Sequence, residues 1–176
     1  MSKIGLKYPV YKGTTKKGVI AKAIQADISI STSDVKLFAD DVVSESDVSF
    51  QSGTLTLNID DLSAEMQTEF LGHAKNVATA EITANVDDIN PFVGVGFYAV
   101  KMVAAVRKYR ALWFPKIKFA EPSDSLATKG ETLAFGTDSL VGTIFPNDAG
   151  DWKQEQTFAT EAEAKTYLDG KSGITV

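Results

Sequence analysis

The sequence lacks cysteine and contains a single histidine, His73. Without cysteine, disulfide bridges, zinc–thiolate centres and thiol nucleophiles are excluded, and a lone histidine excludes metal sites built from several imidazoles. No apolar run approaches the ~20 residues of a membrane span. The first residues also lack the apolar segment of a signal peptide. We therefore expect a protein made in the cytoplasm, without a cleaved signal, disulfides or membrane insertion.

Acidic and basic residues occupy separate blocks of the chain, whose net charge is −5. Residues 37–90 contain eleven Asp or Glu and one Lys, whereas residues 91–120 contain six Lys or Arg and no acid. Blocks of opposite sign on one small domain favour head-to-tail contacts between copies. They also fit neutralisation within a single fold, and the sequence leaves both readings open.

Alternation with a period of two dominates the chain, whose 176 residues suit one domain. In residues 20–30 the even positions are mostly apolar, which predicts a long strand with one buried face. Turn-forming residues at 31–34, followed by renewed alternation, predict a hairpin over about residues 32–47. Further strands are expected at 48–59, 92–102, 107–119, 132–145 and 152–158.

Two of these strands change phase along their length. Apolar residues move from even to odd positions at Ser52-Gly53, and a similar slip is expected near Gly136. A β-bulge at each slip would keep both halves of the strand facing the same core. Long bulged strands suit a curved, closed sheet.

Two short helices are predicted from their capping residues. Ser63, or Asp61 just before it, can cap a helix that runs to about Leu71 and stops at Gly72. A capping box at residues 160–163 opens a second helix over about residues 160–169, with Gly170 as its expected end. The expected fold is mainly β, a single-domain β-sandwich or barrel-like sheet over residues 1–176 with two short flanking helices.

Candidate catalytic groups are few. Adjacent acids at residues 40–41, 60–61 and 87–88 could serve acid–base catalysis or hold a cation, but neighbouring residues on a strand point to opposite faces. His73 is placed to interact with the end of the first helix. Nucleophile-elbow, phosphate-loop and metalloprotease motifs do not occur. We expect no enzymatic activity, no cofactor and no metal site.

Two further motifs invite a binding interpretation. The glycines of Gly94-Val95-Gly96 resemble part of a dinucleotide loop, but the sequence continues as a strand, which favours close backbone approach or strand bending at these glycines. Residues 107–110 mix basic and aromatic side chains, as in a nucleic-acid platform. The acidic isoelectric point of about 4.9 favours a solvated or intersubunit strand face instead.

Short blocks along the chain occur in an order and spacing known from one protein family. They lie at residues 3–11, 26–30, 34–41, 60–63, 70–73, 94–98, 107–111, 115–116 and 119–122. Together they resemble phage major tail proteins of the phi13 type, and they cover nearly the whole chain.

This resemblance implies a structural role. In such tail tubes, subunits form hexameric rings whose inner sheets merge into a continuous lumen, and stacked rings conduct DNA during infection. The implied partners are copies of the same chain, a tape measure protein in the lumen, and tail terminator or distal tail proteins at the tube ends. The implied location is the virion tail, after assembly in the host cytoplasm. The resemblance transfers no catalytic residue.

Two segments are candidates for self-assembly. We hypothesise that the polar 32–47 hairpin projects toward a neighbouring ring. We also hypothesise that the basic residues of the expected strand at 107–119 contact acids of a neighbouring subunit. The candidate contact residues are Lys36, Phe38, Asp40, Asp41, Glu45, Asp47, Arg107, Lys108 and Arg110. The alternatives are a tube protein of a contractile tail or of a phage-tail-like bacteriocin, another particle component such as a tail terminator, and a monomeric β-sandwich binding module.

Overall fold

The computed structural model describes the backbone of residues 3–20, 23–39, 42–123 and 138–175, and the side chains of residues 5–20, 23–34, 48–123 and 138–175. Most of the described residues lie in strands. The elements, in chain order, are β1 (Lys3–Lys12), β2 (Lys17–Val19), β3 (Ala23–Ala39), β4 (Val42–Ile59), α1 (Ala64–Met66), the π-helical turn η1 (Gln67–Leu71), β5 (Ala74–Lys75), β6 (Ile82–Thr83), β7 (Val93–Val103), β8 (Val106–Phe119), β9 (Asp138–Phe145), β10 (Gln154–Phe158) and α2 (Glu161–Ser172).

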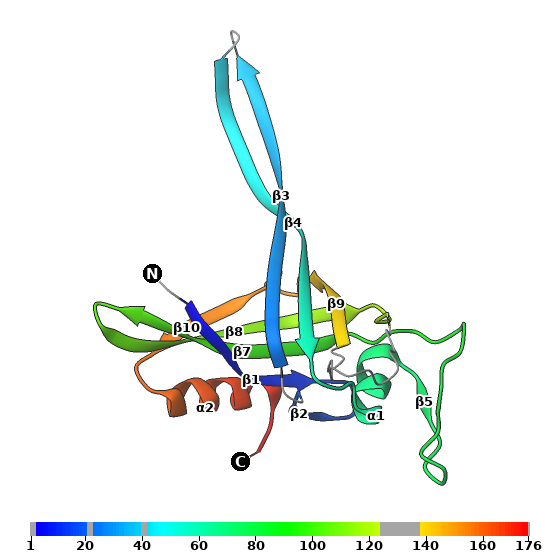
Figure 1. The fold of residues 1–176 in the computed structure, drawn as a ribbon. Helices are drawn as coiled ribbons and strands as arrows, with labels where there is room; N and C mark the ends of the chain where they lie inside the picture. Colours follow the sequence, from blue (N-terminus) through cyan, green and yellow to red (C-terminus); the bar gives the residue numbers. More distant parts are fainter. Residues whose placement is uncertain (1–2, 21–22, 40–41, 124–137, 176) are drawn as a thin grey trace, which may run out of the picture.

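One large antiparallel sheet dominates the described residues (Figure 1). Its strands follow the order β2-β1-β7-β8-β9-β4-β3, and β10 also pairs with β8. The first half of β8 pairs with β10 and its second half with β9, so these two short strands share one edge of β8. The predicted fold class is confirmed: the chain is mainly β, with two short helices, and is consistent with a β-sandwich or barrel-like fold.

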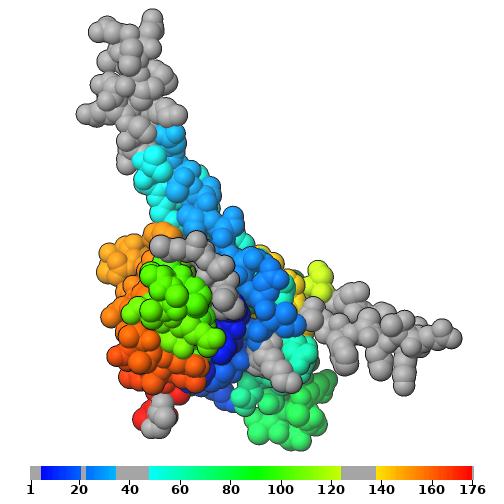
Figure 2. Space-filling model, turned by 60° about the vertical axis from the view of Figure 1, so that its left-hand side comes forward, coloured from blue at the N-terminus to red at the C-terminus, as the bar shows by residue number. Residues whose placement is uncertain are grey.

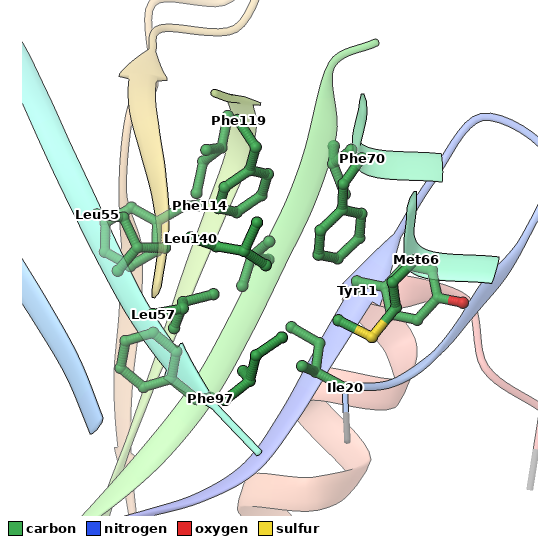
Figure 3. Packing of buried hydrophobic residues seen from close by; sticks show 14 of the residues in the cluster. Tyr11, Ile20, Leu55, Leu57, Met66, Phe70, Phe97, Phe114, Phe119 and Leu140 are labelled. Carbon is green, nitrogen blue, oxygen red and sulfur yellow. The ribbon is translucent and has the colours of Figure 1, made fainter. Parts of the chain in front are cut away.

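The main core lies between the β4 layer and the β7–β8 layer (Figure 3). Leu55 and Leu57 of β4 are fully buried, as is Phe114 of β8, and Phe97 of β7 is nearly so. Phe70 from η1 closes one end of this core and stacks on Phe119, with ring centroids 4.9 Å apart. Burial of this apolar surface is the main source of stability for the sheet.

A second core lies on the opposite face of β7 and β8, beneath α2. Trp113 and Tyr98 from the sheet pack with Ala164 and Leu168 from the helix. A Cβ atom on Gly96 would lie 2.5 Å from Cε3 of Trp113, and one on Gly94 would lie 2.6 Å from its Cζ2. The prediction that these glycines permit close packing is confirmed, and the indole ring is what occupies the space.

Both helix starts match their predictions. The Met66 amide donates to Ser63 Oγ at 3.3 Å, so Ser63 is the cap, and Gly72 ends the turn with φ +78°. Thr160 and its capping box begin α2 as expected. The predicted end at Gly170 is wrong, because α2 continues to Ser172 and stops at Gly173, which has a φ of +75°.

The β3–β4 hairpin is far longer than predicted and rises out of the body as an arm (Figure 1). Residues 31–34 form no turn; they continue β3, because their backbone groups pair with β4. The predicted bulge is present beside the expected position, at Gln51, where the register shifts between Ser31/Ser52 and Thr32/Phe50. The slip predicted near Gly136 lies outside the described residues.

The N-terminal segment forms β1, a strand that the alternation pattern does not reveal. Its register against β7 shifts twice, between Ile4 and Leu6 and between Lys7 and Val10. At these irregularities Gly5 and Tyr8 have φ values of +69° and +51°. Two bulges in ten residues change the side-chain phase, which hides the strand from a period-two search.

Candidate assembly surfaces

The outer edge of β3 is an open edge of the sheet. Within the described residues, β3 is the terminal strand and pairs only with β4. Ile24, Ile28 and Ile30 are 57%, 37% and 36% exposed, although the alternation predicts a buried face here. That prediction is wrong because a groove, and no closely packed element among the described residues, lies over this face of β3. Exposed apolar side chains on a free edge are a common site of strand pairing and association.

A groove of about 290 Å³ runs beside this edge. It lies between β3 and the inner faces of β1, β7 and β8. Its lining includes Leu6, Ile24, Ile28, Ala99, Lys101 and Arg110. We call the three exposed isoleucines and this groove the open flank. The flank combines apolar side chains with basic residues at one end, so it suits a partner that has an apolar and acidic surface.

The predicted basic contacts occupy β8 at this basic end. Arg110 Nη2 lies 2.5 Å from Glu155 Oε2 on β10, and Lys153 Nζ lies 3.1 Å from the same oxygen. The hydrogen bond from Arg110 is the main cause of a lowered pKa for Glu155. Arg110 is thus engaged within its own chain, whereas Arg107 is exposed and Lys108 is half-buried. A contact between these residues and a neighbouring subunit stays a prediction.

The arm contains the other predicted contacts. Lys36, Phe38, Glu45 and Asp47 lie in strands whose backbones are paired out to Ala39 and Val42. Asp40 and Asp41 lie outside the described residues. Nearer the body, the cross-strand pairs of the arm include polar residues, and the Ser33 and Ser49 hydroxyls lie 3.3 Å apart. The projecting hairpin is therefore present, but whether it reaches a neighbouring ring stays a prediction.

His73 anchors a loop that the sequence did not identify as functional. Its Nδ1 lies 3.0 Å from Asp88 Oδ2, and its Nε2 lies 3.0 Å from Glu121 Oε2. The imidazole is buried, and the hydrogen bond with Asp88 is the largest cause of its raised pKa. The sequence predicted that His73 interacts with the end of the first helix, and this prediction did not include its contacts with Asp88 and Glu121. Sequence offers no signal here, because the three residues are brought together by the tertiary fold.

The loop anchored in this way, residues 74–91, presents apolar side chains to solvent. Val77, Val86 and Ile89 are 96%, 97% and 79% exposed. Polar hydrogen bonds hold its shape; the Ala78 amide, for example, donates to Asn76 Oδ1 at 2.9 Å. A loop that is ordered by polar bonds while its aliphatic side chains point outward is a second candidate association surface.

The two acids at residues 87–88 differ in their surroundings. Asp88 contacts His73, whereas Asp87 is exposed. Across the described ranges, no group of three or more His, Asp or Glu side chains is placed to hold a metal ion. In the same ranges, no helix has the length and apolar character needed to cross a bilayer.

Comparison with known proteins identifies no family. No family model matches the chain, and no curated protein matches its sequence. Among solved structures, the chain is similar to the tube-terminating cap of the anti-feeding prophage, with 11% sequence identity and a TM-score of 0.47. The match covers 89% of this chain and 93% of the cap. Because the TM-score is below 0.5, the match assigns neither a family nor a function to this chain.

Proposed function

We propose that the chain is a non-enzymatic structural subunit of a phage tail or a related tail-like particle, in which copies form rings that stack into a tube. On this proposal the rings are hexameric, and DNA passes through the lumen. The sequence resemblance to phage major tail proteins motivates the choice of assembly.

The observation that supports the proposal most strongly is the open flank. A free strand edge beside exposed Ile24 and Ile28 leaves hydrogen-bonding groups and apolar surface uncovered in a single copy. Such an edge invites aggregation unless a partner covers it. If a second copy covers this edge and each copy repeats the same contact, the copies form an assembly. A contact with the right rotation between copies closes the assembly into a ring.

The shape of the arm is the argument for the proposed stacking of rings. It leaves the body at a steep angle to the long axis of the β7–β8 hairpin (Figure 1). A surface that extends away from the body suits a contact with a neighbouring layer, whereas the flank suits a contact within one layer. The net acidic charge of −5 also suits a channel for DNA, because basic walls would retain phosphate.

Sedimentation velocity and negative-stain microscopy over a range of concentrations test this function. We expect annuli or cylinders at high concentration, and a charged substitution on the flank, Ile28→Lys, should abolish them while the chain stays folded. Ile117→Ala is the matched control. Ile117 is buried on β8, which does not pair with β3, so the change should destabilise the core without altering the edge. A wild-type chain that stays monomeric at every concentration would support the binding-module alternative instead.

A further inference from the structure

We propose that the 74–91 loop of one copy docks on the open flank and the adjacent β7–β8 turn of the next copy. The inference deepens the proposed function, since it rests on association between copies and names the two surfaces that meet. In the proposed contact, the loop is the apolar surface with acidic residues, and the flank with the turn is the apolar surface with basic residues.

The loop provides the acidic side. Val77 and Val86 are almost fully exposed, and Glu81 and Asp87 lie exposed on the same loop. Glu121, which contacts His73 at the base of the loop, keeps 63% of its side chain exposed. Aliphatic side chains that share a loop with exposed carboxylates suit a contact with an apolar surface that has basic residues around it.

The flank and turn provide the basic side. Beyond the groove, β7 and β8 are joined by Ala104 and Ala105, whose φ values are +47° and +64°. Val106 is 55% exposed at this turn, and Arg107 follows it on the surface. Lys101 and Lys108 face each other across the two strands. No acid lies between residues 89 and 120, so the hairpin itself contributes only basic charges. Glu155 on β10 pairs with Arg110, whereas Arg107 lies exposed beside the turn.

The two surfaces lie at opposite ends of the molecule. In Figure 1 the β7–β8 turn extends to the left, and the loop that holds β5 extends to the right. The rotated view in Figure 2 places them apart as well, with the turn toward the viewer and the loop at the bottom. A contact between opposite ends is head-to-tail, so each copy uses both surfaces and the arrangement repeats.

The loop is organised before it meets a partner. His73 holds Asp88, the Asn85 amide donates to Asp88 Oδ2 at 2.9 Å, and Asn90 Nδ2 donates to the Phe119 carbonyl at 2.6 Å. These bonds fix the loop on the body. A surface that is already ordered loses less conformational entropy on binding.

Charge reversal in matched pairs tests the contact. One chain has R107E and K108E, and a second has E81K and D87K; all four side chains are on the surface or half-buried and have no role in the core. Arg110 is left unchanged, because it pairs with Glu155. A K12E chain controls for reversal at an exposed site outside both surfaces. Assembly is measured by light scattering and microscopy at low and high salt.

We expect each reversed chain alone to need at least about a tenfold higher concentration to assemble, because like charges meet at the contact. An equimolar mixture should regain assembly, since the acidic turn of one chain then meets the basic loop of the other. If the wild type assembles but the reversed chains assemble equally well, or the mixture gains nothing, the assigned contact is wrong. If the wild type never assembles, the proposed function itself fails.

Discussion

His73 Nδ1 lies 3.0 Å from Asp88 Oδ2, and this contact fixes the base of the 74–91 loop to the end of the first helix. The imidazole is buried, and Glu121 lies on its other nitrogen. Both facing groups are carboxylates, so the protonated imidazolium is favoured. The protonation of one side chain therefore affects one of the contacts that hold the loop on the body.

The pKa of His73 should lie above its ordinary value of 6.5, chiefly because of the hydrogen bond with Asp88. As the chain has one histidine, a proton NMR titration gives one imidazole signal whose midpoint measures this pKa. Asp88→Asn should lower the midpoint, and Glu121→Gln should lower it less. A midpoint at or below 6.5 in the wild type would contradict the geometry.

The stability of the fold should also depend on the charge of His73. Because its pKa is higher in the folded state than in the unfolded state, its stabilisation is present below pH 6.5 and is lost as pH rises through the folded pKa. The free energy of unfolding from urea titrations should therefore fall as the pH rises above 6.5, until the histidine has lost its proton in the folded state as well. His73→Gln should remove this decline, and a decline of equal size in that variant would assign it to other groups.

Gly96 should not tolerate a side chain. Its added Cβ would lie 2.5 Å from Trp113 Cε3 and 2.9 Å from Leu168 Cδ2, so Gly96→Ala should destabilise the fold by about 1–3 kcal/mol. Gly170→Ala is the control, because nothing lies within 4 Å of its added Cβ and α2 continues through it. There we expect a gain of about 0.5–1 kcal/mol. Urea unfolding of both variants measures the difference.

Deletion of residues 40–46 should stop tube growth and leave folded monomers. The deletion removes only the end of the arm, far from the buried Leu55 and Leu57 of β4, so near-wild-type circular dichroism is expected. Electron microscopy of the variant measures assembly. Normal tubes from this chain would reject the stacking role of the arm.

The sequence by itself determined the local structure. Capping residues such as Thr160 set the helix starts, because their hydroxyl and carboxylate groups satisfy amides within one turn. The alternation of apolar and polar residues predicted most strands. The change of phase at Ser52-Gly53 predicted a bulge within two residues of Gln51, where the register shifts. These features depend on neighbours within a few residues, so a local pattern is enough to identify them.

Only the tertiary structure decided which surfaces stay open. The apolar face of β3 has the pattern of a buried strand, yet its position at the edge of the sheet leaves Ile24 and Ile28 exposed. His73, Asp88 and Glu121 meet although they are up to 48 residues apart. Periodicity tells which side of a strand is apolar, whereas the tertiary fold decides which elements pack over that side. That packing depends on contacts between distant parts of the chain, which a local pattern does not contain.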